Sequence, residues 1–161
     1  MSFYRRRLPH WIPEQSIVFV TWRLAGSVDT PSRLLDAQIA AVVANALQHG
    51  QAVRHFYHLH AWVIMPDHVH VLWEPRIDLA SIMRWLKGRT SRVANRILGR
   101  TGLPFWQDES FDHWVRSTEE LRDLVDYVEG NPVKAGLAET AAQWPWSSAW
   151  QTTETDRLPH P

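Results

Sequence analysis

The stretch from Ala61 to Pro75, AWVIMPDHVHVLWEP, constrains the fold of this chain more than any other. Two apolar runs lie on either side of Pro66 and Asp67, and these residue types favour a turn, so the stretch predicts a β-hairpin. Because successive side chains of a strand point to opposite faces, His68 and His70 share one face of the second run, and the apolar residues that alternate with them share the other. One face can therefore pack on a core while two imidazoles lie side by side on the opposite face.

A His-x-His pair on a strand has two interpretations. Neutral imidazoles are common metal ligands, so the pair can be half of a metal site, with Asp67 able to orient one of the rings. Two such histidines can also be ordinary hydrogen-bonded residues of a core or a surface, and the spacing alone leaves both interpretations open. His58 and His60 alternate in the same way, but their aromatic and aliphatic neighbours favour packing roles.

Apolar periodicities along the rest of the chain predict an alternation of strands and helices. The predicted elements are a strand at Ser16–Leu24, a helix at Ser32–His49 closed by Gly50, a strand at His55–Met65, the strand with the two histidines, a helix at Leu79–Leu98, a strand or strand pair at Phe105–Arg116, and a helix that Ser117 caps. Gly88 predicts a bend or a break in the second helix, since glycine is a poor helix former. The order resembles a ferredoxin-like α+β fold, in which helices cover one face of an antiparallel sheet and the other face is left for a catalytic site.

Length and composition set further limits. A chain of 161 residues predicts a single domain over residues 1–161, with a core at about 12–150, a basic N-terminal arm and a C-terminal tail that we expect to be disordered. The absence of cysteine excludes disulfides and thiolate metal sites. No apolar run approaches the length of a membrane span, so we expect a cytoplasmic protein that does not bind membranes.

Basic and acidic residues are segregated along a chain whose net charge is zero. Residues 83–100 hold six basic side chains and no acid, whereas residues 108–129 hold eight acids. A neutral protein can therefore carry a basic surface. Arg89, Arg92 and Arg96 recur every three or four positions, so they can form a stripe that follows a phosphate backbone, or simply a solvated helix face.

The third predicted helix contains YVEGNPVKAGL, from Tyr127 to Leu137. Tyr127 and Asn131 are four residues apart, which at about 3.6 residues per turn puts them on the same side of the helix. We expect Pro132 to end the regular helix. Alone, the pattern fits a boundary tyrosine followed by a helix-terminating Asn-Pro. Beside two imidazoles, however, the amide oxygen could complete a three-ligand metal site, and the phenol would be a candidate nucleophile toward phosphate.

Five motifs in order resemble those of the REP-associated tyrosine transposases of bacteria, which belong to the HUH single-tyrosine transposase superfamily. They are MPDHVHVLWEP, LKGRTS at Leu86–Ser91, FWQDESFDHWVR, YVEGNPVKAGL and WPWSSAW at Trp144–Trp150. The resemblance covers roughly residues 3–150. It implies that His68 and His70 are metal ligands and that Tyr127 is the nucleophile. It also implies that Asn131 is the third ligand, at a position where related insertion-sequence transposases usually carry glutamine.

The same resemblance implies an activity and a partner. Such enzymes cleave and rejoin single-stranded DNA at hairpins from repetitive extragenic palindromes, using Mg²⁺ or Mn²⁺ and a covalent 5′-phosphotyrosine intermediate. The family favours a monomer, and a dimer stays open. The candidate DNA-binding residues on the second helix and the N-terminal arm are Arg84, Lys87, Arg89, Arg92, Arg96, Arg5, Arg6 and Arg7.

Two other functions stay open at the level of sequence. One is a non-catalytic module that binds hairpin DNA or RNA, and the other is a small metal hydrolase that uses bound water, with Tyr127 structural. The joint presence of a candidate nucleophile and candidate metal ligands favours the transposase interpretation. Trp106 and Trp114 are candidates for stacking on unpaired bases, although most of the ten tryptophans should lie in the core.

Overall fold

The computed structural model describes residues 2–4, 16–26 and 33–150. The predicted arm residues Arg5, Arg6 and Arg7 and the C-terminal tail lie outside the described residues. The elements are β1 (Ser2–Tyr4), β2 (Val18–Leu24), η1 (Arg33–Leu35), α1 (Ala37–Ala52), β3 (Tyr57–Ile64), β4 (His68–Pro75), α2 (Leu79–Leu98), β5 (Trp106–Trp114), α3 (Thr118–Lys134) and η2 (Ala141–Gln143). Within these ranges, no helix is long and apolar enough to cross a membrane.

The strands form one antiparallel sheet in the order β1-β5-β2-β4-β3. The four strands β5-β2-β4-β3 have the order expected of a ferredoxin-like fold, so the predicted α+β fold class is confirmed. β1 is an addition at the edge, where it pairs with β5. The register places Thr21 of β2 between His70 of β4 and Phe111 of β5, and Arg23 opposite His68.

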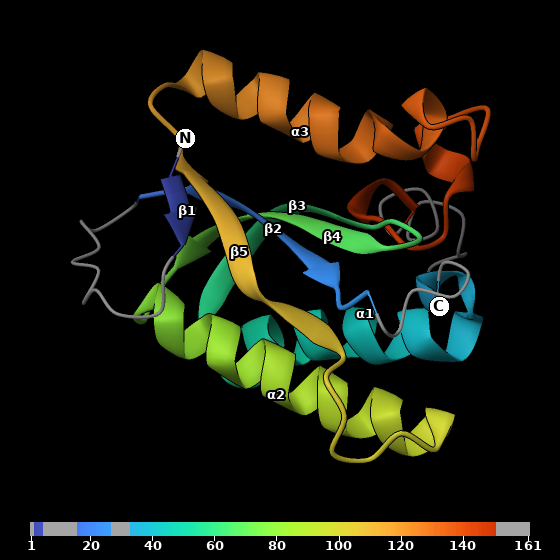
Figure 1. Cartoon of the computed structure of the whole chain (residues 1–161). Coiled ribbons are helices and arrows are strands. Elements are labelled where there is room, and N and C mark those ends of the chain that lie inside the picture. The colour runs from blue at the N-terminus through green and yellow to red at the C-terminus, as the bar shows by residue number, and fades with distance from the viewer. Residues whose placement is uncertain (1, 5–15, 27–32, 151–161) are drawn as a thin grey trace, which may run out of the picture.

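The helices lie on both faces of the sheet (Figure 1). α1 and α2 cover one face, as expected, and α3 crosses the other. The alternation along β2 explains this arrangement: Val18, Val20 and Trp22 pack with the residues of α1 and α2, whereas Phe19 packs with Val128 of α3. The second core is smaller than the first, so α3 leaves part of its face of the sheet uncovered.

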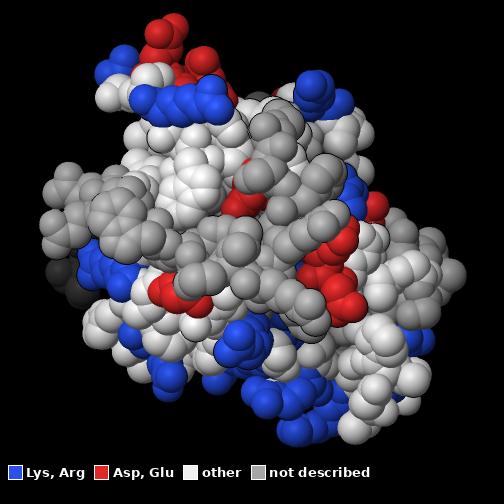
Figure 2. All heavy atoms as spheres, turned by 60° about the vertical axis from the view of Figure 1, so that its left-hand side comes forward, with Lys and Arg blue, Asp and Glu red and all other residues white. Residues whose placement is uncertain are grey.

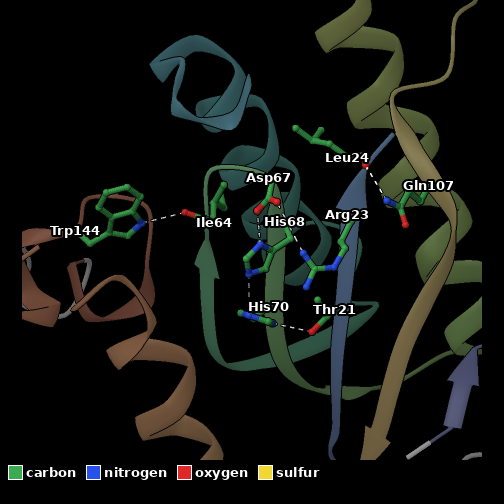
Figure 3. A network of polar contacts seen from close by, with 9 residues as sticks. All are labelled: Thr21, Arg23, Leu24, Ile64, Asp67, His68, His70, Gln107 and Trp144. Atoms are coloured by element: carbon green, nitrogen blue, oxygen red, sulfur yellow. Dashed lines mark hydrogen bonds and ion pairs between the residues drawn. The ribbon is translucent and has the colours of Figure 1, made fainter. Parts of the chain in front are cut away.

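The C-terminal motif WPWSSAW covers the outer edge of β3. The backbone N–H of Ile64 donates to the carbonyl of Trp146 at 2.8 Å, and the N–H of Trp62 donates to Ser148 Oγ at 3.0 Å. Trp144 Nε1 donates to the Ile64 carbonyl at 2.9 Å (Figure 3). These bonds satisfy backbone groups that an exposed edge strand would leave unpaired.

Gly50 does not close the first helix, as the sequence had suggested, because α1 continues to Ala52. A Cβ atom at position 50 would overlap the ring and hydroxyl of Tyr57, whose Oη donates to the Leu47 carbonyl at 2.8 Å. The glycine therefore permits the close approach of a buried tyrosine to the helix. Glycine inside a helix lowers stability by about 1 kcal/mol relative to alanine, and the packing of Tyr57 offsets this cost.

Two further boundary predictions were wrong. α2 runs without interruption through Gly88, from Leu79 to Leu98. α3 continues past Pro132 to Lys134, because a proline this close to the end removes only one hydrogen bond and the next N–H groups still find carbonyls: Ala135 N–H donates to the Asn131 carbonyl at 3.0 Å. Beyond this end the chain turns at Gly136, whose φ of 74° lets the following N–H donate back to the Pro132 carbonyl at 2.8 Å.

Candidate active site

The two histidines of β4 meet on the face of the sheet that α3 crosses. His68 Nε2 and His70 Nε2 are 3.1 Å apart, and the ring planes are inclined by 76° (Figure 3). The strand alternation explains why both rings point to the same side. Their Nε2 atoms therefore converge on one point.

The other nitrogen of each ring has its own partner. His68 Nδ1 lies 2.6 Å from Asp67 Oδ1, in the turn before β4, and His70 Nδ1 lies 2.7 Å from Thr21 Oγ1, on the neighbouring strand. A carboxylate only accepts hydrogen bonds, so Asp67 keeps the proton of a neutral His68 on Nδ1 and leaves Nε2 with a lone pair. The Thr21 hydroxyl can accept from Nδ1 of His70 in the same way. This arrangement is typical of ligand histidines, which are held by a second hydrogen bond.

Burial keeps both rings neutral. Desolvation, with smaller contributions from His68 and Arg23, lowers the pKa of His70 to about 3. Desolvation also lowers the pKa of His68, although the hydrogen bond that His68 donates to Asp67 opposes the shift. An imidazole must be neutral to bind a metal, so proton competition at these nitrogens is weak at neutral pH.

Tyr127 projects from α3 next to this pair. Its ring centroid is 5.5 Å from that of His70 and 6.0 Å from that of Phe19, and 44% of the residue is exposed. The start of α3 is held by Ser117, which accepts from the Glu120 N–H at 3.0 Å, and by a hydrogen bond between His113 of β5 and Glu120. The predicted capping residue is thus confirmed, and the helix presents a reachable phenol beside two imidazoles.

Asn131 lies one turn beyond Tyr127 on α3 and is half-buried. The described residues contain no group of three or more His, Cys, Asp and Glu side chains that could hold a metal. A third protein ligand would therefore have to be another kind of donor, and an amide oxygen suits Mg²⁺ or Mn²⁺. The two neutral imidazoles suit such a cation, and Asn131 stays the predicted third donor.

A cleft of about 630 Å³ opens between α3 and the strands β2 and β5. His70 and Tyr127 both line it, as do the apolar rings of Phe19 and Phe111. Arg23 is the single lysine or arginine that lines the cleft in the described part of the chain. Its side chain is half exposed, and its Nη1 lies 3.9 Å from Asp67 Oδ2. Glu109 also lines the cleft, so an anion there would meet one positive charge, that of Arg23, and one carboxylate.

Thr21 and Arg23 were missed by sequence reasoning. Their alternation along the first predicted strand shows that they share a face, but not which strand lies beside them. The pairing of β2 with β4, across 49 residues of sequence for Thr21 and His70, decides that contact. A single threonine or arginine on a strand does not by itself indicate that the residue belongs to a site.

Other predicted residues lie away from this site. His58 and His60 stack edge to face at 5.0 Å, and His60 lies 3.9 Å from Glu74. Trp106 is buried in the core, where its Nε1 donates to Thr90, so it cannot stack on a base in this conformation. Trp114 packs against the same core.

The basic helix α2 lies across the sheet from the histidines (Figure 1). Lys and Arg side chains gather along the lower side of the molecule, where α2 runs (Figure 2). Four arginines of α2 are exposed, namely Arg84, Arg89, Arg92 and Arg96. Lys87 is half-buried, and its Nζ donates to the carbonyls of Gln107 and Asp108 at 2.8 and 3.2 Å. The structure therefore does not bring the basic helix and the histidine pair together on one face.

This combination of a ferredoxin-like sheet, a histidine pair on a central strand and a tyrosine on the crossing helix is that of a transposase family. Residues 32–131 match the family model described as "Transposase IS200 like", and the chain belongs to that family.

Among individual proteins, the chain is similar to the REP-associated tyrosine transposase of Escherichia coli (strain K12), with 32% identity over 94 residues, covering 57% of this chain and 54% of that protein. A relative from Haemophilus influenzae is 31% identical over 108 residues, covering 60% of this chain and 61% of its own length. The matches thus span between half and two thirds of these curated relatives. A solved structure of a REP-associated tyrosine transposase bound to a REP hairpin superposes with a TM-score of 0.71 at 25% identity, covering 99% of this chain and 89% of that one.

Proposed function

We propose that this protein is a metal-dependent transesterase that cleaves and rejoins single-stranded DNA at REP-type hairpins through a 5′-phosphotyrosine on Tyr127. The observation that supports this most is the position of an exposed phenol 5.5 Å, ring to ring, from one of two converging neutral imidazoles in the same chain. A hydrolase that activates water has no need of that phenol. The proximity within one chain also favours a monomer in which Tyr127 acts in its own site.

His68, His70 and Asn131 would hold Mg²⁺ or Mn²⁺, which when bound withdraws electron density from the scissile phosphate. Tyr127 Oη forms a bond to phosphorus as the bond from phosphorus to the 3′ oxygen breaks. The phenolic proton passes to solvent, and the departing 3′ oxygen takes up a proton to become a hydroxyl. In the reverse step a 3′ hydroxyl attacks the phosphotyrosine, which restores a phosphodiester and releases the tyrosine.

Arg23 would bind a non-bridging oxygen of the same phosphate. Two observations support this: it is the one permanent cation among the described residues that line the cleft, and Asp67 holds it beside the histidines. A guanidinium can donate two parallel hydrogen bonds to a phosphate. Negative charge accumulates on these oxygens as the new bond forms, so a fixed cation there lowers the barrier.

Binding of the hairpin is assigned to the basic side chains of α2 and of the N-terminal arm. The proposed set is Arg84, Lys87, Arg89, Arg92, Arg96, Arg5, Arg6 and Arg7. The similarity to a protein bound to a REP hairpin supports the choice of DNA. A chromosomal substrate of this kind would place the reaction in the cytoplasm.

The test is a denaturing gel of the protein incubated with labelled hairpin DNA and Mg²⁺ or Mn²⁺. We expect a labelled protein band that survives denaturation and disappears in Tyr127→Phe. Tyr57→Phe is the matched control, because it removes a hydroxyl from a tyrosine buried in the opposite core and should leave the band intact. Cutting by Tyr127→Phe would favour the water-using hydrolase, and binding without cutting by the wild type would favour the non-catalytic module.

A further inference from the structure

α2 contains a glycine that close packing does not explain. Gly88 lies in the middle of an unbroken helix of 20 residues, and a Cβ added there would meet nothing within 4 Å. Glycine in an exposed helix interior costs about 1 kcal/mol relative to alanine. Gly50, by contrast, is required by the ring of Tyr57. Gly88 therefore keeps a space open at a cost in stability.

A hollow of about 420 Å³ lies over Gly88, between α2 and the segment 102–108 that leads into β5. Arg84 precedes Gly88 by four residues and Ser91 follows it by three, so both flank it on the same side of the helix and both line the hollow. Lys87 lines it as well, and Asp108 is the single acid among its lining residues. The hollow is thus net positive, with a floor of backbone that an oxygen atom can approach closely.

The wall opposite α2 is held in place by Lys87. Its Nζ donates to the carbonyls of Gln107 and Asp108, so its hydrogen bonds fix the start of β5 against the helix while its charge remains near the hollow. The hollow is therefore shaped before any ligand arrives.

The hollow and the cleft meet at Gln107, which lines both. A chain that leaves the cleft at this point can cross the edge of the sheet and reach α2. The two sites lie on opposite faces of the sheet and share Gln107 as a lining residue.

We propose that the hollow over Gly88 binds a backbone phosphate of the DNA strand whose scissile phosphate lies in the cleft. Arg84 contacts the phosphate oxygens, and the absence of a side chain at Gly88 lets the phosphate sit against the helix. The Ser91 hydroxyl donates to the Gly88 carbonyl at 3.1 Å and only borders the hollow. The strand crosses the sheet edge at Gln107. This inference rests on the proposed function, since it needs a DNA strand in the cleft, and it explains why basic residues lie on the face away from the histidines.

The first experiment measures binding of hairpin DNA with a single-stranded flank by fluorescence anisotropy over a range of salt concentrations. We expect Arg84→Gln to weaken binding by about tenfold and to reduce the slope of log K against log salt by about 0.7, the effect of losing one single-strand phosphate contact. The matched control is Arg54→Gln, which removes the same charge from an exposed residue after α1 that does not line the hollow. If Arg84→Gln loses no more DNA affinity than Arg54→Gln, the proposal is overturned.

A second pair of variants separates folding from binding. Gly88→Ala and Gly88→Glu should both keep or raise stability, because each residue forms helix better than glycine and neither meets an atom within 4 Å at Cβ. Gly88→Ala should nevertheless weaken DNA binding several-fold, because its methyl group fills the space that the phosphate needs, and Gly88→Glu should weaken it further, since it places a carboxylate there. Wild-type affinity of Gly88→Ala would refute the hollow as a site. Formation of the Tyr127 adduct by the wild type is measured in parallel, and its absence would instead count against the proposed function.

Discussion

The hydrogen bond between Thr21 and His70 offers a sharp test of the metal site. Thr21→Val removes the hydroxyl but keeps nearly the same volume, so the variant loses the 2.7 Å contact with His70 Nδ1 without opening a cavity. The nitrogen is then buried without a partner, because His70 is only 5% exposed. The ring is free to change tautomer or to rotate, and Nε2 no longer reliably presents its lone pair beside His68.

The expected effect on metal binding follows from the role of such outer hydrogen bonds. Their loss lowers metal affinity by about 10- to 100-fold, or about 1.4 to 2.8 kcal/mol. The free energy of unfolding should fall by about 1 to 3 kcal/mol as well, because a buried polar group loses its partner. A calorimetric titration with Mn²⁺ measures the first quantity, and urea denaturation with a chelator present measures the second.

Thr90→Val is the matched control. Thr90 is also buried, donates to the Leu86 carbonyl at 2.6 Å and accepts from Trp106 Nε1 at 2.8 Å, but it lies in the core under α2. This variant should lose stability by a similar amount and keep the Mn²⁺ affinity of the wild type. Equal Mn²⁺ affinity for Thr21→Val and Thr90→Val would refute the role assigned to Thr21, and no Mn²⁺ binding by the wild type would refute the metal site itself.

Three further predictions concern stability, pH and rate. Gly50→Ala should lower the free energy of unfolding by about 2 to 4 kcal/mol in urea denaturation, because its Cβ overlaps the Tyr57 hydroxyl; an unchanged midpoint would contradict the packing argument. The free energy of unfolding of the metal-free protein should fall by about 2 kcal/mol as the pH is lowered from about 7.5 to 5. The pKa of His70 is about 3 in the folded state and near 6.5 in the unfolded state, so the unfolded state takes up the proton first. His70→Gln should show a flatter pH dependence in the same measurement, and an equally steep one would exclude His70 as its source. Arg23→Gln should slow adduct formation at saturating DNA by about 100-fold while changing the DNA dissociation constant little, and the reverse pattern would make Arg23 a binding residue only.

The local chemistry of the site was largely predictable from the sequence. Alternation along a strand is a property of the backbone, so His68 and His70 had to share a face once the turn at Pro66 was recognised. The helical spacing of Tyr127 and Asn131 and the Ser117 cap are local in the same sense. Each depends on residues within a few positions of one another, where the chain has few alternatives.

The wrong predictions arose where packing against residues distant in the sequence outweighed a local helix propensity. Gly50 and Gly88 are both poor helix formers, yet both lie inside helices, because packing against the sheet outweighs a cost of about 1 kcal/mol. Pro132 is similar, since it lies so close to the end of α3 that the helix loses little by containing it. Propensity alone cannot distinguish these cases from true ends of helices.

The sequence by itself determined the order of the elements from β2 to α3, the two histidines on one strand face, and the tyrosine and asparagine on one helix side, but not the edge strand β1. Only the tertiary structure decided that α3 crosses the histidine face, that Thr21 and Arg23 lie beside the pair, and that the basic helix is on the far side. The physical reason is that periodicity is set by backbone geometry over a few residues. Strand order and register, by contrast, depend on which apolar faces can be buried together across the whole chain.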